Sequence, residues 1–370
     1  MLNKSVNILV KQSDSVRKFM YSERERRDRL STKSEFDRVE LKEMSVADFI
    51  DCIENQSRSD SYYYWTSNDV FDDDIRDELW NTFQDVRERN GCKETGLAPS
   101  IWMGGLGTCT QAHYDVLDNI FIQLHGEKQF HLWPPSDIMS LHFFPDAHSR
   151  SRKSQINNVL SPNAKDHETF PFLKDVSEPL TFTLGPGDVL FIPSFWVHYV
   201  EVTSSEASVS INSFNEENTK RWAGNVLSHP APFRFGPRKQ IANVIHQRRL
   251  RENTSLSVRR EIFRDAVHLL GISPHFLNRL YISRFASFAP DDTLLLKNQS
   301  GLQDLSIDQK EIDIVNRDLN SLSSNLFASG VDETYVNGVT ETVLCHVLEK
   351  WALSLFEPND VHVAFSAAES

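Results

Sequence analysis

The stretch that decides the fold reads Thr110-Gln-Ala-His-Tyr-Asp-Val-Leu-Asp-Asn-Ile-Phe-Ile-Gln-Leu-His-Gly-Glu-Lys128. Side chains alternate faces along a β-strand, so His113 and Asp115 point to one face while Tyr114 points to the other. An imidazole and a carboxylate side by side, completed by a second histidine from elsewhere, form the facial triad that holds non-haem Fe(II). The stretch therefore predicts two of the three ligands of an iron site.

A second apolar stretch supplies the remaining histidine. It reads Gly185-Pro-Gly-Asp-Val-Leu-Phe-Ile-Pro-Ser-Phe-Trp-Val-His198, and such a turn and run are typical of a buried strand. A His-X-Asp tripeptide alone is weak evidence, because a chain with 13 histidines contains such patterns by accident. Two β-rich stretches bounded by turn residues favour a metal centre made of His113, Asp115 and His198.

Size and composition narrow the class of protein. The chain of 370 residues can form one large domain with a smaller one, and its formal charge of −13 argues against a generally basic nucleic-acid binder. Its four cysteines contain no Cys-X-X-Cys pair, so neither a zinc ribbon nor a disulfide framework is predicted. We therefore expect an intracellular protein, cytoplasmic or nuclear. No apolar run approaches the length that spans a bilayer, so no membrane contact is predicted.

Composition and apolar spacing divide the chain into three segments. The first is expected to support the core, the second to be the core, and the third to be helical. Their bounds are residues 1–98, 99–215 and 216–370. Apolar residues recur at helical spacing in residues 257–270 and 340–356, which predicts two helices in the third segment. The end of the chain, from Asn359 onward, is predicted to be frayed.

The first segment carries both strand and helix signals. The aromatic run Tyr62-Tyr-Tyr-Trp65 favours a strand. Ser45 is placed to cap a helix, with Asp48 in its first turn. A further helix is predicted from Asp72 to Val86, because acidic residues open it and apolar residues follow at helical spacing.

The motifs of the second segment resemble a known family. The run His113–Asn119, followed by Gly126-Glu-Lys128 and Gly187-Asp-Val-Leu-Phe-Ile-Pro193, is similar to Fe(II)- and 2-oxoglutarate-dependent oxygenases of the JmjC/cupin-8 group. Two subgroups are most similar, the tRNA wybutosine hydroxylases and the asparaginyl hydroxylases that inhibit hypoxia-inducible factor. The resemblance covers roughly residues 100–215. It implies a mainly β core, a double-stranded β-helix or jelly-roll, with flanking helices and a helical C-terminal region.

The same resemblance implies the cofactors and their anchors. Fe(II) and 2-oxoglutarate would be bound, with O2 as a co-substrate. Lys128 matches the lysine that holds the far carboxylate of 2-oxoglutarate, and Thr110 matches a hydroxyl donor to that carboxylate. Compared with the resembling enzymes the chain begins late, so a preceding helix and strand are expected to be absent from it.

Asparagines and a tyrosine complete the implied co-substrate site. Asn119 and Asn212 match family asparagines that line it. Asn212 shares a strand face with the serines two and four residues before it, which is an unusually polar face for a barrel interior. A tyrosine from the aromatic strand would touch 2-oxoglutarate. Tyr62 and Tyr64 share a face, so the sequence leaves the choice between them open.

The predicted activity is hydroxylation of a macromolecular substrate. The runs Arg152-Lys-Ser-Gln155 and Thr169-Phe-Pro-Phe172 resemble the insertion of the asparaginyl hydroxylases, and with the acidic total charge they favour a protein side chain. The run Val116-Leu-Asp-Asn119 favours the alternative, a wybutosine-type base hydroxylase acting on tRNA. Basic residues that could contact its phosphates are Arg238, Lys239, Arg248, Arg249 and Arg251.

Other functions compete with hydroxylation. A lysine demethylase shares the metal chemistry, although no reader module or zinc cluster accompanies the core. A catalytically inactive cupin scaffold is opposed by the full set of His113, Asp115, His198, Thr110 and Lys128, since a decayed site loses some of its residues. The resemblance also implies a homodimer formed through the C-terminal helices.

Overall fold

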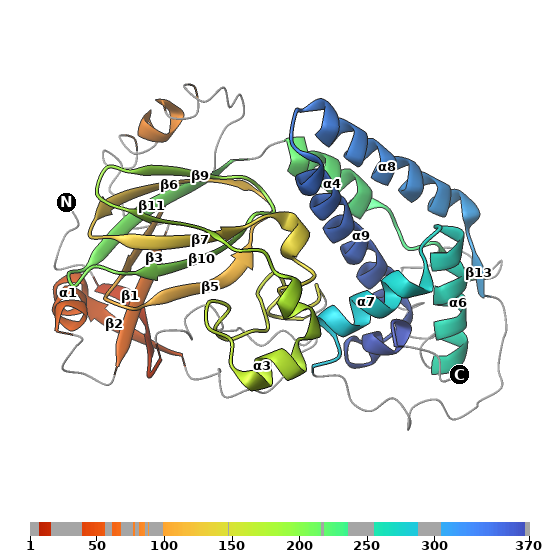
Figure 1. The fold of residues 1–370 in the computed structure, drawn as a ribbon, viewed down its shortest axis with the longest axis horizontal. Helices are drawn as coiled ribbons and strands as arrows, with labels where there is room; N and C mark the ends of the chain where they lie inside the picture. Colours follow the sequence, from red (N-terminus) through yellow and green to blue (C-terminus); the bar gives the residue numbers. More distant parts are fainter. Residues whose placement is uncertain are drawn as a thin grey trace.

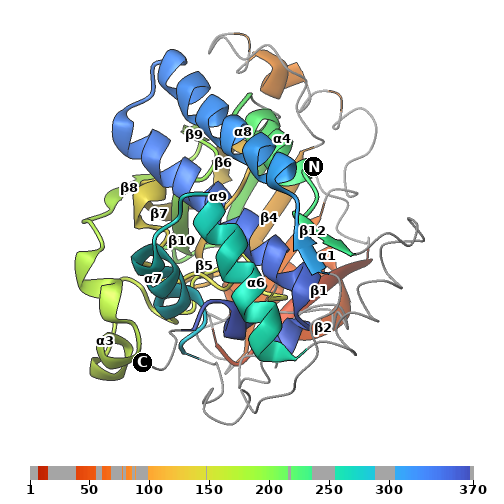
Figure 2. The ribbon, with the colours of Figure 1, turned by 90° about the vertical axis from the view of Figure 1, so that its right-hand side faces the viewer.

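The computed structural model describes residues 7–15, 39–55, 61–67, 77, 81–85, 88, 99–146, 148–215, 218–235, 255–287 and 305–366. Strands fill one half of the molecule and the C-terminal helices fill the other (Figure 1). Turned by 90°, the molecule presents the outer helices of the second half, with the strands behind them (Figure 2). The site described below lies among the strands.

The N-terminal segment adds strands to the edge of one sheet. Its elements are β1 (Asn7–Ser13), β2 (Glu40–Ser45), α1 (Val46–Glu54) and β3 (Tyr62–Ser67). The predicted cap of α1 is confirmed, because the Ser45 hydroxyl accepts a hydrogen bond from the backbone N–H of Asp48. The strand predicted at the aromatic run is also confirmed as β3. The helix predicted from Asp72 to Val86 lies largely outside the described residues.

Two antiparallel sheets form the core. Its strands are β4 (Ser100–Gly104), β5 (Cys109–Tyr114), β6 (Asp118–His125), β7 (Lys128–Trp133), β8 (Leu180–Leu184), β9 (Val189–Ile192), β10 (Val197–Val202) and β11 (Ser208–Asn215). One sheet has the order β2-β1-β3-β4-β11-β6-β9 and the other the order β5-β10-β7-β8. These antiparallel sheets, with several helices beside them, fit a jelly-roll core.

An apolar cluster shows that the two sheets face each other. Phe121 on β6 and Ile192 on β9 come from the seven-stranded sheet. They pack with Phe130 on β7, Leu184 on β8 and Val200 on β10, which come from the four-stranded sheet. Alternation of side chains along each strand places these residues on the inner faces. Burial between the sheets therefore fixes the register of β10, the strand that carries His198.

The insertion between β7 and β8 contains only short helices. They are η4 (Pro135–Asp137), α3 (Ala164–Thr169) and η5 (Pro171–Asp175). A capping box at Asn163 and Asp166 begins α3. The rest of the insertion is irregular and is held by hydrogen bonds to the neighbouring elements. In Figure 1 the part that carries α3 lies beside both the strands and the helical half.

Helices dominate the C-terminal segment. The elements are α4 (Asn218–Ser228), β12 (Phe233–Phe235), α6 (Leu256–Leu269), α7 (Pro274–Arg284), β13 (Leu305–Ile307), α8 (Gln309–Ala328), α9 (Glu333–Leu355) and η7 (Pro358–Ala364). The frayed end predicted from Asn359 is wrong as far as Ser366, because Val361, Val363 and Phe365 are fully buried. None of the described helices is both long enough and apolar enough to cross a bilayer.

Helix α9 is the central element of the helical half. It lies between the strands and the outer helices α6 and α8 in both views (Figures 1 and 2). The helix predicted from residue 340 begins earlier, because the Asp332 side chain caps it by accepting from the N–H of Tyr335. Its buried residues surround the axis instead of forming one stripe, as expected for a helix enclosed by the core.

One apolar cluster extends across the boundary expected at residue 215. It contains Tyr114, Trp133 and Tyr199 from the strands together with Val339 and Val343 from α9. Interiors pack at the density of organic crystals, so such a shared cluster transmits displacements between the parts that build it. The strands and the C-terminal helices thus share one interior.

Gly338 permits the closest approach between the two halves, and Gly338→Ala is expected to be destabilising. A Cβ at Gly338 would lie 2.3 Å from the Ser136 nitrogen and 2.4 Å from the Pro135 carbonyl carbon, both of them backbone atoms. Overpacking of this kind costs about 1–3 kcal/mol of unfolding free energy, to be measured by denaturant titration.

The matched control for this variant is Gly224→Ala in α4. A Cβ there meets nothing within 4 Å, so the substitution should stabilise its helix by about 0.5–1 kcal/mol. Equal effects of the two substitutions would contradict the close packing of α9 against η4.

Candidate metal centre

Adjacent antiparallel strands bring the three predicted ligands together. His113 on β5 is the register partner of His198 on β10, and their ring centroids are 4.1 Å apart. Asp115 directly follows β5, and its Oδ2 lies 3.9 Å from His113 Nε2 and 3.8 Å from His198 Nε2. In the described part of the chain this is the one group of three ligand-type side chains whose ligand atoms lie within 4.8 Å of one another.

Backbone carbonyls orient both imidazoles. His113 Nδ1 lies 2.7 Å from the carbonyl oxygen of Gln111, and His198 Nδ1 lies 3.1 Å from that of Trp196. A carbonyl oxygen only accepts, so each Nδ1 carries the proton and each Nε2 keeps a lone pair. The two Nε2 atoms are the atoms nearest Asp115, and this donor set fits a divalent metal in a two-histidine, one-carboxylate site.

Burial keeps both imidazoles neutral. Desolvation, helped by the nearby His198, lowers the pKa of His113 to about 3. Desolvation also lowers the pKa of His198. Ligation requires neutral imidazoles, so the two side chains are held in the protonation state that binds a metal.

Lys128 is a buried cation at the start of β7, the strand that pairs with β10. Only 2% of it is exposed, and its Nζ donates a 2.6 Å hydrogen bond to the hydroxyl of Ser210. The Nζ also lies 5.5 Å from the ring centroid of Phe121. Burial lowers the pKa of Lys128 to about 7, and none of the ion pairs of the described residues includes it. A buried ammonium is costly without a counter-ion, so an anionic ligand fits this position.

The structure distinguishes the two tyrosines that the sequence leaves open. Tyr64 is buried, and its hydroxyl lies 3.3 Å from the Thr110 hydroxyl. Burial raises the pKa of Tyr64 to about 12, so it stays protonated and can donate a hydrogen bond. Tyr62 is only half-buried at the start of β3, opposite Ser13. Tyr64, and not Tyr62, is therefore the tyrosine whose hydroxyl contacts that of Thr110.

The two predicted asparagines bond to each other. The amide of Asn212 donates to the side-chain oxygen of Asn119 at 2.9 Å, and both side chains are buried. The indole of Trp102 donates to the side-chain oxygen of Asn212 at 2.6 Å. Sequence reasoning missed Trp102, because nothing in its own strand distinguishes it from a packing residue.

A turn before β10 was also missed by sequence reasoning. The backbone N–H of Phe195 donates to the carbonyl of Asp115 at 2.7 Å, and that of Ser194 donates to the Asp118 carboxylate at 2.6 Å. Phe195 has a φ of 65°, which is strained for a residue with a bulky side chain. The turn thus links the chain before His198 to the chain around Asp115, and no residue type in it signals the positive φ.

The insertion runs beside the strand that carries the first ligands. The N–H of Tyr114 donates to the carbonyl of Arg152, and the N–H of Ser154 donates to that of Ala112. The Arg152 guanidinium lies 3.9 Å from Asp115 Oδ1 and its side chain is 43% exposed, so it borders the centre from the solvent side. The basic residues predicted as a phosphate-binding cluster lie outside the described residues.

His142 in the insertion predicts a pH dependence of stability. It is buried, donates from Nδ1 to the carbonyl of Ser283 at 3.0 Å and accepts from the N–H of Phe172 at 3.3 Å. Burial lowers its pKa from 6.5 to about 4, so between these values the unfolded chain binds a proton that the folded chain does not. Stability should therefore fall with decreasing pH, by about 2 kcal/mol from this residue between pH 7 and pH 5.

Denaturant titrations of the wild type and of His142→Asn at both pH values test this. The variant keeps a side-chain donor but has no titratable group at this position. Between pH 7 and pH 5 its unfolding free energy should therefore fall by about 2 kcal/mol less than that of the wild type. An unchanged pH dependence in the variant would contradict the assignment.

Comparisons with known proteins agree with this geometry. A family model described as a cupin-like domain matches residues 6–220. HSPB1-associated protein 1 of Bos taurus is 36% identical over 159 residues, covering 42% of this chain and 30% of that protein. JmjC domain-containing protein F of Dictyostelium discoideum is 34% identical over 128 residues, covering 32% of this chain and 27% of that protein.

A third relative is a tRNA-modifying protein by its name. tRNA wybutosine-synthesizing protein 4 of Neurospora crassa is 37% identical over 102 residues, covering 28% of this chain and 8% of that protein. The matched stretches span less than a third of the length of each of these relatives. The likeness is therefore to one part of those proteins.

Proposed function

This chain belongs to the JmjC/cupin-like family, and from that premise we propose that it is an Fe(II)- and 2-oxoglutarate-dependent oxygenase that hydroxylates a protein side chain. The observation that carries the proposal is the group formed by His113, Asp115 and His198, together with the buried Lys128 on β7, the strand paired with β10. The two facing sheets are taken as the halves of a double-stranded β-helix. Residues 99–215 would be its catalytic part.

Each residue would have a distinct role at this site. His113, Asp115 and His198 would hold Fe(II), whose chemistry would couple oxidation of 2-oxoglutarate by O2 to hydroxylation of the substrate, with succinate and CO2 as co-products. Lys128 would neutralise the far carboxylate of 2-oxoglutarate, which the ammonium can do strongly because it is shielded from water. Thr110 would add a hydroxyl to the same end of the molecule.

The remaining polar residues would position the co-substrate. Tyr64 would orient the Thr110 hydroxyl or donate directly to the co-substrate, because its own hydroxyl stays protonated. Asn119 and Asn212 hold each other in place, so their free lone pairs and amide protons would present fixed polar groups. Such preorganised groups bind without further ordering of side chains.

A protein substrate is favoured over a nucleic acid. The net charge of −13 repels a polyanion, whereas the insertion beside β5 offers backbone and the half-exposed Arg152 to an extended peptide. The alternative of a wybutosine-type tRNA base hydroxylase is supported by the likeness to tRNA wybutosine-synthesizing protein 4. We further propose an intracellular location, cytoplasmic or nuclear, and a homodimer formed by the C-terminal helices, which light scattering of the full chain would test.

The test is conversion of 2-oxoglutarate to succinate by the purified full chain with Fe(II) and ascorbate. Peptide pools and bulk tRNA are supplied separately, and succinate is counted against substrate oxidised. Stimulation by peptide with an added oxygen atom in the product is expected. Stimulation by tRNA alone would replace the protein substrate with the nucleic acid, and release of formaldehyde would indicate demethylation. If neither Mn(II) nor 2-oxoglutarate binds, the chain is an inactive scaffold.

A further inference from the structure

One face of α9 touches the chain around the metal centre at four separate places. The residues concerned are Tyr335, Gly338, His346 and Glu349, whose spacing puts them within one narrow arc of the helix. Gly338 meets the backbone that follows β7, as described above. The other three contacts reach the turn before His198, the strand of His113 and the insertion.

Tyr335 holds the turn before His198. Its hydroxyl donates to the carbonyl of Ser194 at 3.0 Å and lies 3.1 Å from the Ser194 hydroxyl. That turn also contains Trp196, whose carbonyl orients the His198 imidazole. A displacement of Tyr335 would therefore move the group that aims His198 Nε2.

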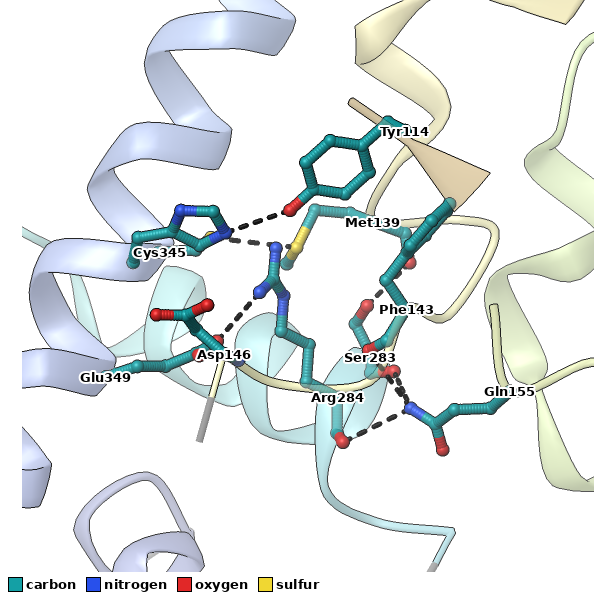
Figure 3. A network of polar contacts seen from close by, with 10 residues as sticks. Tyr114, Met139, Phe143, Asp146, Gln155, Ser283, Arg284, Cys345 and Glu349 are labelled. Carbon is teal, nitrogen blue, oxygen red and sulfur yellow. Dashed lines mark hydrogen bonds and ion pairs between the residues drawn. The ribbon is translucent and has the colours of Figure 1, made fainter. Parts of the chain in front are cut away.

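His346 holds the strand of the other two ligands. Tyr114 stands between His113 and Asp115 in the chain, so strand alternation puts its side chain on the opposite face. Figure 3 shows this side chain directed towards α9. Its hydroxyl shares a buried hydrogen bond of 2.9 Å with His346 Nε2. The Tyr114 ring also packs 5.1 Å from that of Phe143, centroid to centroid. Both partners are buried, so water does not replace the bond if it is lost.

Glu349 holds the insertion. Its carboxylate accepts from the backbone N–H of Asp146 and from the Arg284 guanidinium, the latter at 2.8 Å with both side chains fully buried (Figure 3). Gln155 ties the same insertion to the end of α7 by donating to the carbonyls of Ser283 and Arg284. Asp146 and Gln155 lie on either side of Arg152 in the chain. The part of the insertion that borders Asp115 is thus fixed to the helical half on both sides.

We propose that α9 is the positioning element of the metal centre, and that Tyr114 and His346 form the positioning pair through which it presets the ligands of β5. The inference rests on the metal-binding part of the proposed function. Ligand side chains on strands are preorganised only if the strand ends are fixed, and groups that hold metal ligands in place raise metal affinity by such fixing. Here the fixing contact comes from a helix, not from the sheet.

The test measures Mn(II) affinity of the full chain at constant pH for the wild type and Tyr114→Phe. The variant keeps the ring and its packing and removes only the hydroxyl. Mn(II) binding should weaken by about tenfold, as for loss of an orienting partner. The absorption spectrum of bound Co(II), which reports ligand geometry, should change as well. A double variant with His346→Leu should bind no more weakly than the weaker single variant.

Tyr199→Phe is the matched control. Tyr199 is equally buried and directly follows His198, and its hydroxyl donates to the Glu201 carboxylate at 3.2 Å. Its Mn(II) affinity should stay within about twofold of the wild type, although its unfolding free energy should drop by about 1 kcal/mol, as expected for Tyr114→Phe. Wild-type Mn(II) affinity and Co(II) spectrum in Tyr114→Phe would overturn the positioning role. A wild-type chain that binds no Mn(II) would instead overturn the proposed function itself.

Discussion

His198→Ala is expected to weaken binding of Mn(II) by at least about a hundredfold and to abolish 2-oxoglutarate turnover. The imidazole is one of three ligand side chains, and the carbonyl of Trp196 already aims its Nε2 at the centre. Structural zinc sites with four ligands bind with about 10–16 kcal/mol, so one ligand there is worth about 2.5–4 kcal/mol. Isothermal titration with Mn(II) at constant pH measures the loss directly.

The matched control is His131→Gln on the neighbouring strand β7. His131 is buried beside Tyr199 of β10 and shares a 2.9 Å hydrogen bond with Thr181, so the variant removes an imidazole that is not a ligand. Its Mn(II) affinity should stay within about twofold, since the His131 hydrogen bond among the described residues goes to Thr181 and not to a ligand residue. Equal Mn(II) affinity of His198→Ala and the wild type would rule out the proposed centre.

Lys128→Met is expected to weaken the binding of 2-oxoglutarate and to make the ligand-free protein more stable. The 2-oxoglutarate affinity of the Mn(II)-loaded protein should fall by at least about thirtyfold, because loss of one partner of a buried charge pair costs about 2–5 kcal/mol. The protein without ligands should become more stable, because a buried ammonium bonded only to a hydroxyl opposes folding. Titration calorimetry and denaturant unfolding measure the two effects.

The sign of the pH dependence follows from the same residue. The pKa of Lys128 falls from 10.5 to about 7 on folding, so between these values the unfolded chain holds a proton that the folded chain has released. Its contribution to stability therefore improves as the pH rises from about 7 towards 10.5, and Lys128→Met should lack that rise. Lys174→Met, at an exposed lysine, controls for the change in net charge. A ligand affinity unchanged in Lys128→Met would contradict the anchor role.

Local patterns were enough to predict the strands and to single out His113, Asp115 and His198, which the structure brings together and whose metal binding stays a prediction. The alternation around His113 and Asp115, and the Gly185–Asp188 turn that leads into β9, depend on neighbouring residues alone. The polar face of Asn212 was predicted in the same way. Lys128 came from the family resemblance, and its burial agrees with that interpretation.

Contacts between distant segments could not be predicted. Helix α9 lacks a one-sided apolar stripe, so periodicity does not locate its start at Glu333. The choice between Tyr62 and Tyr64 depends on how far β3 extends over Thr110. The burial of Phe365 depends on α6 and α7, where it packs against Phe263 and Phe285. Each of these features depends on contacts between residues that are far apart in the sequence, so no local pattern predicts it.

Tyr114 and His346 are 232 residues apart, so α9 leaves the ribosome long after the ligand strands. At about 5–20 residues per second, roughly ten to fifty seconds separate their synthesis. During that interval the apolar side of the strands around Trp133 and Tyr199 has no helix against it, and such a surface attracts chaperones or other nascent chains. On the proposed role of α9, the metal centre would be completed in the last stage of the protein's synthesis, and slow or interrupted translation past the core would yield chains that carry His113, Asp115 and His198 but retain metal weakly.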